Sequence, residues 1–391
     1  MTEQRNAGGV RVVSEDDDSA SADTTAALPV EPGFAESSTG EPSGPSRLDQ
    51  ATEFVTEHRK AVLAGVVGLV AIAALGASRI DVGGVVVDGV SVGAVYAMVA
   101  LGIALVYRST KVLNFAQGEL GTVPAFLVLM LLTGFDRAAI LDPASISLVR
   151  LVLFALVGVL AGAVLAIGVN TLVVQRLAEA NPVTSLVATA GVSFLLIGGQ
   201  VVVFELQSRT FPRVLQGSVC FVRGDDGCLL QTNAHNLVIL SVLVVVAAGL
   251  ALLFRTQLGT ALLATAQEPF AAALHGVSPR AMSSLAWGLA GGLAALGGIL
   301  GAGYFAGLTP GLMTTTFLIP AFTAAVLGGM TSMTGAVVGG VLVGLVAALA
   351  NAIATTYGLT SVIPRPPPLA SFVVLLLVLL IRPRGLFGKE A

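Results

Sequence analysis

Charged residues are scarce in this sequence: they make up 11% of its 391 residues, whereas apolar residues make up 55%. A soluble domain needs far more charge to cover its surface, so the composition excludes a soluble fold and indicates a polytopic membrane protein. The scarcity is greatest between Ala281 and Pro364, where the sequence has no charged residue. At about 20 residues per crossing, this stretch suffices for about three or four membrane spans.

The groups on which enzyme chemistry depends are also missing. No Walker-type loop is present, because Gly388 and Lys389 are followed by Glu, so ATP cannot bind in the P-loop manner. The three histidines, His58, His235 and His275, lack metal-ligand spacing, and no nucleophile is paired with a base. We therefore expect no enzyme, no catalytic residue, no metal site and no cofactor. A net charge of −3 without a dense basic tract argues against a nucleic-acid partner.

Cysteine is limited to Cys220 and Cys228, which both lie in the polar segment 205–236. They flank a turn that contains Gly and Asp in the sequence CFVRGDDGC. A small disulfide loop is therefore predicted, provided that this segment faces an oxidising compartment. A cytoplasmic position of the segment would remove the argument.

The first 57 residues differ from the rest of the chain. They carry the acidic run Glu15–Asp18, many Ser, Thr, Pro and Gly residues, and no sustained apolar periodicity. Such a segment cannot bury enough apolar surface to offset its ordering entropy, so we expect residues 1–57 to form a disordered acidic tail. No signal peptide is expected, because the first apolar run starts near Ala61, far from the N-terminus.

The second domain, residues 58–391, is predicted to be an all-α transmembrane bundle of about ten spans, with eight to ten plausible. The segment 317–330 is short for a crossing and contains Pro320, so a broken or re-entrant helix is the alternative there. The expected spans lie near residues 61–78, 84–107, 112–134, 147–168, 184–204, 237–254, 284–303, 317–330, 335–357 and 369–381.

Basic residues give the expected orientation of these spans. Placing the N-terminus inside puts more Lys and Arg on the cytoplasmic side, among them Arg255 and Arg280, than on the opposite side. The bias is modest. It predicts that both termini and the stretch 255–280 lie in the cytoplasm.

The stretch 255–280 lies between long uncharged segments and is predicted to be an exposed excursion with a short helix. Glu268 and Pro269 suit the first turn of a helix, and Gly276 can take the left-handed conformation that ends one. The alanines between them present little bulk. A helix of small residues exposed on a membrane protein suggests docking with a partner, and an ordinary loop helix is the alternative.

Five motifs carry a family resemblance. In the short helix, Ala271 and Ala272 are followed by Gly276, and Phe270 stands before them. The other four are SVGAVYAMVALGIALVY (91–107), LNFAQGE (113–119), AVLGGMTSMTGAVVGG (325–340) and RPRGLFGK (382–389). In this order they resemble the LivH-type branched-chain amino acid permeases of ABC importers, from about residue 85 to residue 389. Residues 269–276 resemble the EAA-type coupling loop, in which Phe270 replaces the Glu of the general motif.

The resemblance implies an ABC importer subunit of the cell membrane that translocates branched-chain or related amino acids. Its implied partners are a second permease, two cytoplasmic ABC ATPases that hydrolyse ATP, and an extracytoplasmic solute-binding protein. The helix near 269–275 would couple the permease to the ATPases, through Glu268, Pro269, Ala271, Ala272 and Gly276.

Other functions stay open at this point. One alternative is an ABC permease for urea, amides or another small organic solute. A secondary transporter or channel is the alternative from another class, and the lack of charge in residues 281–364 argues against ion coupling. A membrane scaffold without transport would leave the coupling helix unexplained.

Polar residues within the expected spans are candidates for a translocation pathway, because burying them is costly without a role or partner. Asn114, Gln117 and Glu119 are grouped in LNFAQGE and are predicted to line or gate the pathway. A helix start at which Glu119 complements the dipole is the alternative. Asp88 is expected at the membrane interface. Gln200 and Asn351 are expected to form hydrogen bonds between helices, and lining of a polar pathway is the alternative for both.

Overall fold

The computed structural model describes residues 80–136, 146–177, 180–224, 227–381 and 385–387. The predicted tail, residues 1–57, and the predicted span at 61–78 lie outside the described residues.

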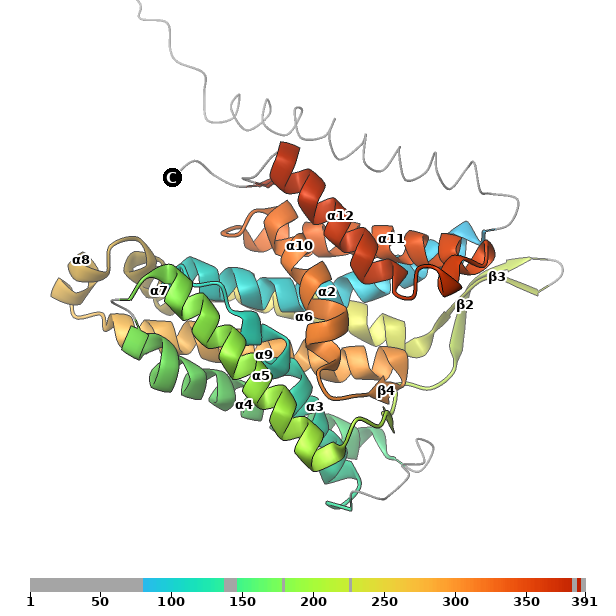
Figure 1. The fold of residues 1–391 in the computed structure, drawn as a ribbon, viewed down its shortest axis with the longest axis horizontal. Helices are drawn as coiled ribbons and strands as arrows, with labels where there is room; N and C mark the ends of the chain where they lie inside the picture. The colour runs from blue at the N-terminus through green and yellow to red at the C-terminus, as the bar shows by residue number, and fades with distance from the viewer. Residues whose placement is uncertain (1–79, 137–145, 178–179, 225–226, 382–384, 388–391) are drawn as a thin grey trace, which may run out of the picture. The chain divides into compact units, whose positions relative to one another are not determined.

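The described residues form an all-α bundle, as predicted, in which seven helical segments have the length and hydropathy to cross a membrane (Figure 1). These segments are α2 (Val82–Thr110), η1 (Phe115–Gln117) with α3 (Glu119–Leu132), α4 (Leu148–Val169) with η3 (Asn170–Val174) and η4 (Gln175–Leu177), α5 (Pro182–Phe204), α6 (Ala234–Leu253), α9 (Pro279–Phe305) and α11 (Met333–Thr356). The bundle also contains two shorter apolar segments. These are η5 (Met313–Phe317) with α10 (Leu318–Gly328), and α12 (Pro366–Ile381).

Local sequence explains where several of these helices begin. The Asp81 carboxylate accepts a hydrogen bond from the Gly84 amide at 3.1 Å and so caps α2. Ser278 caps α9 in the same way, and Pro279 takes the first helical position, which suits a residue without an amide proton. Capping satisfies amide groups that would otherwise lack a partner at a helix start.

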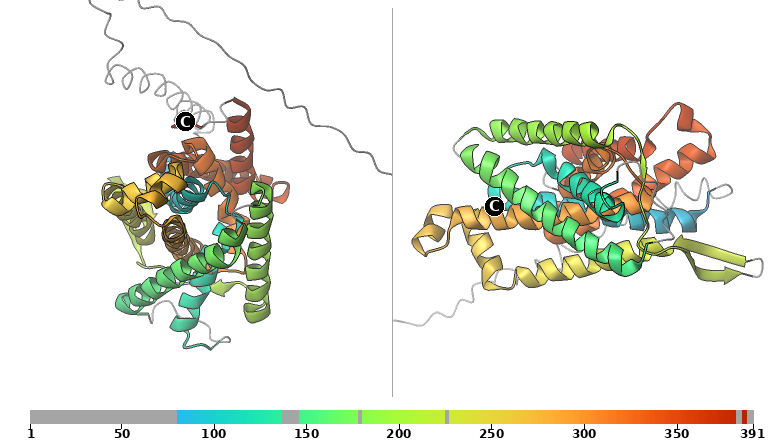
Figure 2. Two further views of the ribbon diagram at one scale, coloured as in Figure 1. Left: turned by 90° about the vertical axis from the view of Figure 1, so that its left-hand side faces the viewer. Right: turned by 90° about the horizontal axis from the view of Figure 1, so that it is seen from below.

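The centre of the bundle consists of α2 and α9. Of the residues in the 18-residue apolar stretch of α2, 94% are buried, and in the stretch of α9 83% are buried. The corresponding share is 17% in the segment that contains α4 and 17% in α5. In the end view of Figure 2, α4 and α5 accordingly lie at the periphery. Helix α11 approaches α2 closely at Gly340, because a Cβ there would lie 2.6 Å from the Ala97 Cα.

The segment predicted at 317–330 is short, and the structure shows why. A π-helical turn, η5, precedes α10, and Pro320 lies inside α10. Together these two elements stay below the length of the seven longer segments. The break leaves residues 309–311 as non-helical backbone between α9 and η5, and side chains of other helices form hydrogen bonds to the backbone at Gly311 and Met313.

The segment 205–236 contains strands that the sequence analysis did not predict. Strands β2 (Ser218–Gly224) and β3 (Gly227–Asn233) form an antiparallel hairpin, and β1 (Arg209–Thr210) pairs with β4 (Gly307–Leu308). The signal was the Gly-Asp turn between short runs rich in β-branched and apolar residues, which is typical of a hairpin. Only the turn was recognised.

The two ends of the bundle carry different structures. Helices α7 (Gln257–Gln267) and α8 (Pro269–Leu274) project at one end, and the β2–β3 hairpin projects at the other (Figure 1). Helix α2 runs from the hairpin end, where β3 packs against it, toward the end that carries α7. We call these the α8 end and the hairpin end.

Candidate functional site

The short helix predicted near 269–275 is present as α8. Glu268 stands between α7 and α8, and Pro269 takes the first position of α8. Gly276 follows the helix with a φ of 80°, a left-handed value that glycine adopts without strain. The local signals in the sequence therefore place this element correctly. Its coupling role is a separate question.

One face of α8 is apolar and exposed. Phe270 is 77% exposed and Leu274 is 74% exposed, and their spacing of four residues puts them on the same side of the helix. Ala272 lies on the other side and is only 6% exposed. The small size of Ala272 is thus required by packing within this chain, whereas Ala271, Gly276 and the two large side chains are open to a partner. A pattern of small residues does not indicate Phe270 and Leu274, and the sequence signal for this face is the spacing of four between two large apolar residues.

Asn114 and Gln117 lie in the break between α2 and α3, and both are buried. The Asn114 amide caps η1 by accepting from the Ala116 amide at 3.0 Å, and it also donates to the Gln117 side chain at 3.1 Å. Gln117 in turn donates to the Ala290 carbonyl of α9 at 3.0 Å. These bonds hold the break against the central helix α9.

Glu119 begins α3 and is fully buried. Its Oε2 accepts a hydrogen bond of 2.5 Å from the Gln200 amide of α5. The Gln200 Oε1 then accepts from the Gly311 amide at 3.3 Å, and the Thr122 hydroxyl accepts from the Met313 amide at 3.2 Å. These bonds connect α3 and α5 to the backbone at Gly311 and at Met313, the first residue of η5.

The bonds of Gln200 confirm the predicted hydrogen bonding between helices. Glu119 Oε1 is buried and, within the described residues, has no hydrogen-bond partner. In this conformation, Gln117 and Glu119 are sealed from solvent, so they do not line an open passage. Their predicted part in a pathway or gate would require the bundle to rearrange.

Asp88 and Asn351 were not expected to lie together, and the structure places both on one cavity. This cavity, of about 670 Å³, lies at the hairpin end among α2, α9, η5 and α11, and we call it the hairpin-end cavity. Asn351 makes no side-chain hydrogen bond to another helix among the described residues, so the interpretation as a bonding residue is wrong for it. Its position on the cavity agrees with the alternative that it lines a polar pathway, and the cavity itself forms only when separate segments pack together.

A second cavity, of about 550 Å³, lies at the α8 end. Lys111, Arg176 and Arg280 line it, together with Pro269 and Pro279. Basic groups from three separate segments thus gather beside α8. This is the distribution that the orientation prediction requires of a cytoplasmic end.

A helical bundle with a polar cavity near one end and an exposed short helix at the other is the architecture of a membrane transport protein. The family is shown by the sequence: residues 85–382 match the family of branched-chain amino acid transport system permease components, and the chain belongs to it.

Curated relatives agree with this assignment. The chain is 29% identical over 308 residues to the high-affinity branched-chain amino acid transport system permease protein BraD of Pseudomonas aeruginosa, covering 78% of this chain and 94% of BraD. It is 24% identical over 314 residues to the corresponding protein LivH of Escherichia coli K12, covering 77% of this chain and 94% of LivH.

Two further proteins are similar. A probable LivH permease of Methanocaldococcus jannaschii is 26% identical over 301 residues, covering 75% of this chain and 88% of that protein. Among solved structures, a chain of PsaBC from Streptococcus pneumoniae in complex with Fab aligns with a TM-score of 0.36 and 16% identity, over 79% of this chain and 93% of that one. That likeness is too low to define the fold.

Proposed function

We propose that this chain is the translocation subunit of an ABC importer for branched-chain amino acids. The observation that carries the proposal is the family match over residues 85–382, together with relatives that are named branched-chain amino acid permeases. The chain would catalyse no reaction of its own. Its partners would be a second permease subunit, two cytoplasmic ATPases and an extracytoplasmic solute-binding protein.

The proposed location is the cell membrane, with both termini and the α8 end in the cytoplasm. The gathering of Lys111, Arg176 and Arg280 beside α8 supports this orientation, because basic residues favour the cytoplasmic side. The hairpin end would then face outward, where the solute-binding protein delivers its cargo.

Coupling to the ATPases would run through α8. Phe270 and Leu274 form an exposed apolar face, which suits a hydrophobic groove on a partner. Ala271 and Gly276 leave room beside these side chains, and the helix begins at Pro269, directly after Glu268. A rigid shift of the ATPases would then move α8 and, through the short turn before Pro279, the central helix α9.

Sealed polar residues would take part in the transport cycle. Asn114, Gln117 and Glu119 lie where α3 and α9 meet the helix breaks, and their bonds must change if these helices separate. We propose that this group acts as a gate in the closed conformation.

The test is uptake by the assembled importer. The five subunits, reconstituted in liposomes with internal ATP, should accumulate labelled leucine, isoleucine or valine and should not accumulate urea or acetamide. Uptake of urea or an amide without any branched-chain amino acid would instead support the alternative solute class. Uptake that continues without ATP and without the ATPases would contradict an ABC importer and favour a secondary transporter or channel.

A further inference from the structure

The hairpin-end cavity has a volume of about 670 Å³, within the range of roughly 300–1,000 Å³ that is usual for small-molecule sites. Its walls come from the start of α2, the end of α11 and the break between α9 and α10. The segment Pro364–Pro368, which leads into α12, forms a further wall. Three separate regions of the sequence, near residues 80–96, 304–316 and 347–368, therefore line one space.

One face of α2 lines this cavity. Asp81, Val85, Asp88, Val92 and Tyr96 follow one another at intervals of three or four residues, the spacing of a single helix face. The face therefore presents two carboxylates, two aliphatic side chains and a phenol to the same space.

Asp88 is the charged residue of this face that no protein contact explains. Asp81 has a structural role, because its carboxylate caps α2 at the Gly84 amide. The Asp88 carboxylate forms no hydrogen bond and no ion pair in the part of the chain that the structure describes. A carboxylate within an apolar span is costly unless it faces a polar cavity or a cationic partner. Asp88 is thus placed to receive a positively charged group of a ligand.

The cavity also contains the opposite charge. Arg365 lines it from the proline-rich segment, and its guanidinium forms no ion pair with either aspartate among the residues described. Guanidinium groups bind carboxylates through two parallel hydrogen bonds. Hydroxyl groups of Thr309, Thr315 and Thr316 line the cavity as well. The two charges are therefore not paired with each other in the part of the chain that the structure describes, and both line the same space.

Aliphatic groups complete the cavity. Val85, Val92, Leu312 and Ala348 line it beside the charged residues and offer an apolar surface for a side chain. We propose that the hairpin-end cavity is a binding site within the permease itself for a zwitterionic amino acid with an aliphatic side chain. Asp88 would bind the α-ammonium group, Arg365 and the threonine hydroxyls the α-carboxylate, and the aliphatic walls the side chain.

This inference rests on the proposed function and adds to it that the permease itself selects the solute. Urea and short amides carry no net charge on any group, so neither Asp88 nor Arg365 would have a counterpart in them. A site with both charges therefore favours amino acids over the neutral solutes, independently of the solute-binding protein.

The test measures protection of a thiol placed in the cavity. Asn351→Cys is introduced in a Cys220→Ser, Cys228→Ser background, and the permease–ATPase complex is embedded in lipid nanodiscs without the solute-binding protein. Thr355→Cys, on the same wall, serves as a second reporter. The labelling rate with a membrane-impermeant maleimide is followed against the concentration of leucine, 4-methylpentanoate, isoamylamine or urea.

Leucine should slow the labelling in a saturable way. The analogue without the ammonium group, the analogue without the carboxylate, and urea should have little effect at the same concentration. Asp88→Asn should raise the leucine concentration needed for half-protection about tenfold, since a charge-assisted hydrogen bond is lost. Glu205→Gln is the matched control, because Glu205 is exposed and does not line the cavity, and it should leave the protection unchanged.

Uptake by the same complex with its binding protein separates the two claims. Leucine uptake without protection at either reporter, or equal protection by all four compounds, would overturn the binding site and leave the proposed function intact. Protection by leucine without leucine uptake would contradict the proposed function and keep the site. If leucine neither protects the reporters nor is taken up, both the binding site and the proposed function are overturned.

Discussion

Glu119 and Asp88 are both carboxylates within apolar helices, and their surroundings differ. Glu119 is fully buried and bonded to Gln200, whereas Asp88 is exposed to the hairpin-end cavity and has no bond among the described residues. A sealed and bonded carboxylate holds helices together, while one that faces an open cavity is free to bind a ligand. A charge within a membrane helix therefore indicates a function only once its surroundings are known.

The largest effect is expected from Glu119→Ala. The substitution leaves the Gln200 amide without its acceptor in a buried place, which costs about 1–3 kcal/mol of folding free energy. It also frees the backbone before η5, which Gln200 holds at Gly311. We expect uptake per inserted permease to fall strongly, and more than the abundance falls. The measurement is solute uptake normalised to membrane-inserted protein.

Glu119→Gln provides the control for that prediction. Its side-chain oxygen can still accept the hydrogen bond from Gln200, so stability should stay closer to wild type. Normal uptake per inserted protein in Glu119→Ala would show that this carboxylate is only a helix-end residue.

The contrast between sealed and open side chains extends to α8. Phe270→Asp places a charge on the exposed apolar face, so we expect normal insertion and loss of ATPase co-purification. Phe135→Asp is the matched control, because Phe135 is also exposed but follows α3. Equal ATPase recovery with wild type and Phe270→Asp would remove α8 as the docking helix.

Ala272→Arg and Gly276→Val test the same helix at its buried side and at its C-terminal end. Since Ala272 is buried, an arginine there should disturb the packing of α8 within the chain and thereby weaken ATPase binding indirectly. Gly276→Val should strain the left-handed residue that ends the helix. Both variants should reach the membrane. ATPase recovery at matched permease levels is the measurement, and wild-type recovery with normal stimulated hydrolysis in both would contradict a coupling role.

Asp88→Asn should separate function from stability. We expect the KM for leucine uptake to rise about tenfold, because the proposed ammonium contact is weakened. The thermal stability of the solubilised complex should not fall, since Asp88 has no hydrogen bond or ion pair in the described chain to lose. A clear fall in stability with unchanged uptake would show that Asp88, like Glu119, stabilises the bundle and does not bind the ligand.

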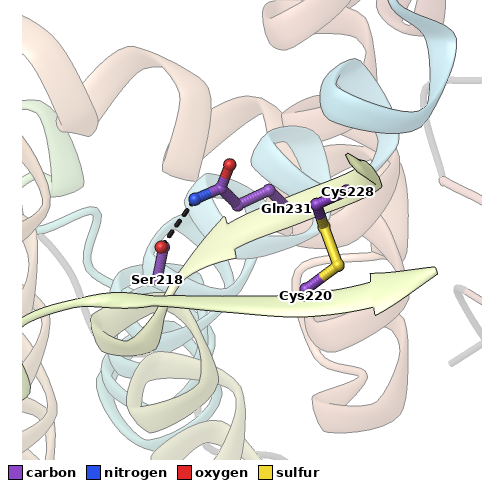
Figure 3. The surroundings of a disulfide bond; sticks show 4 residues. All are labelled: Ser218, Cys220, Cys228 and Gln231. Atoms are coloured by element: carbon purple, nitrogen blue, oxygen red, sulfur yellow. Dashed lines mark hydrogen bonds between the residues drawn. A yellow bond between two sulfur atoms is a disulfide. The ribbon is translucent and has the colours of Figure 1, made fainter. Parts of the chain in front are cut away.

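A smaller effect is expected from the hairpin cysteines. The structure joins Cys220 on β2 to Cys228 on β3, with their Cα atoms 5.8 Å apart (Figure 3). We predict the same bond in cells, because an outward-facing hairpin meets an oxidising compartment. Thiol labelling of intact cells should therefore require a reductant. Ready labelling without one would argue against the bond and against the orientation. Replacing both cysteines by serine should reduce uptake only slightly.

The smallest effect is expected from deletion of residues 2–50. An acidic segment of low apolar content contributes little to a helical bundle, so insertion and uptake should stay nearly unchanged. Comparison of uptake at equal membrane abundance checks this expectation. Failure of assembly on deletion would mean that the segment binds a partner.

Local signals in the sequence located the helices well. The long apolar runs gave α2, α9 and α11, because a span needs about 20 apolar residues and few sequences meet that condition by chance. Capping residues such as Ser278 with Pro279 also indicate a helix start from the sequence, since a cap bonds to amides within one turn. The hairpin was missed because two short strands carry a weak signal inside a polar segment.

The membrane bundle, its family and the short helix between α7 and α9 can be predicted from the amino-acid sequence, because they depend on composition and on neighbours along the chain. Only the folded chain shows that Gln200 bonds to Glu119, that Ala272 faces inward while Phe270 faces outward, and that Asp88 shares a cavity with Arg365. Each of these contacts depends on packing between segments that are far apart in the sequence. Hydropathy gives the depth of a residue along its helix, and only the packed helices decide whether its side chain meets lipid, protein or a cavity.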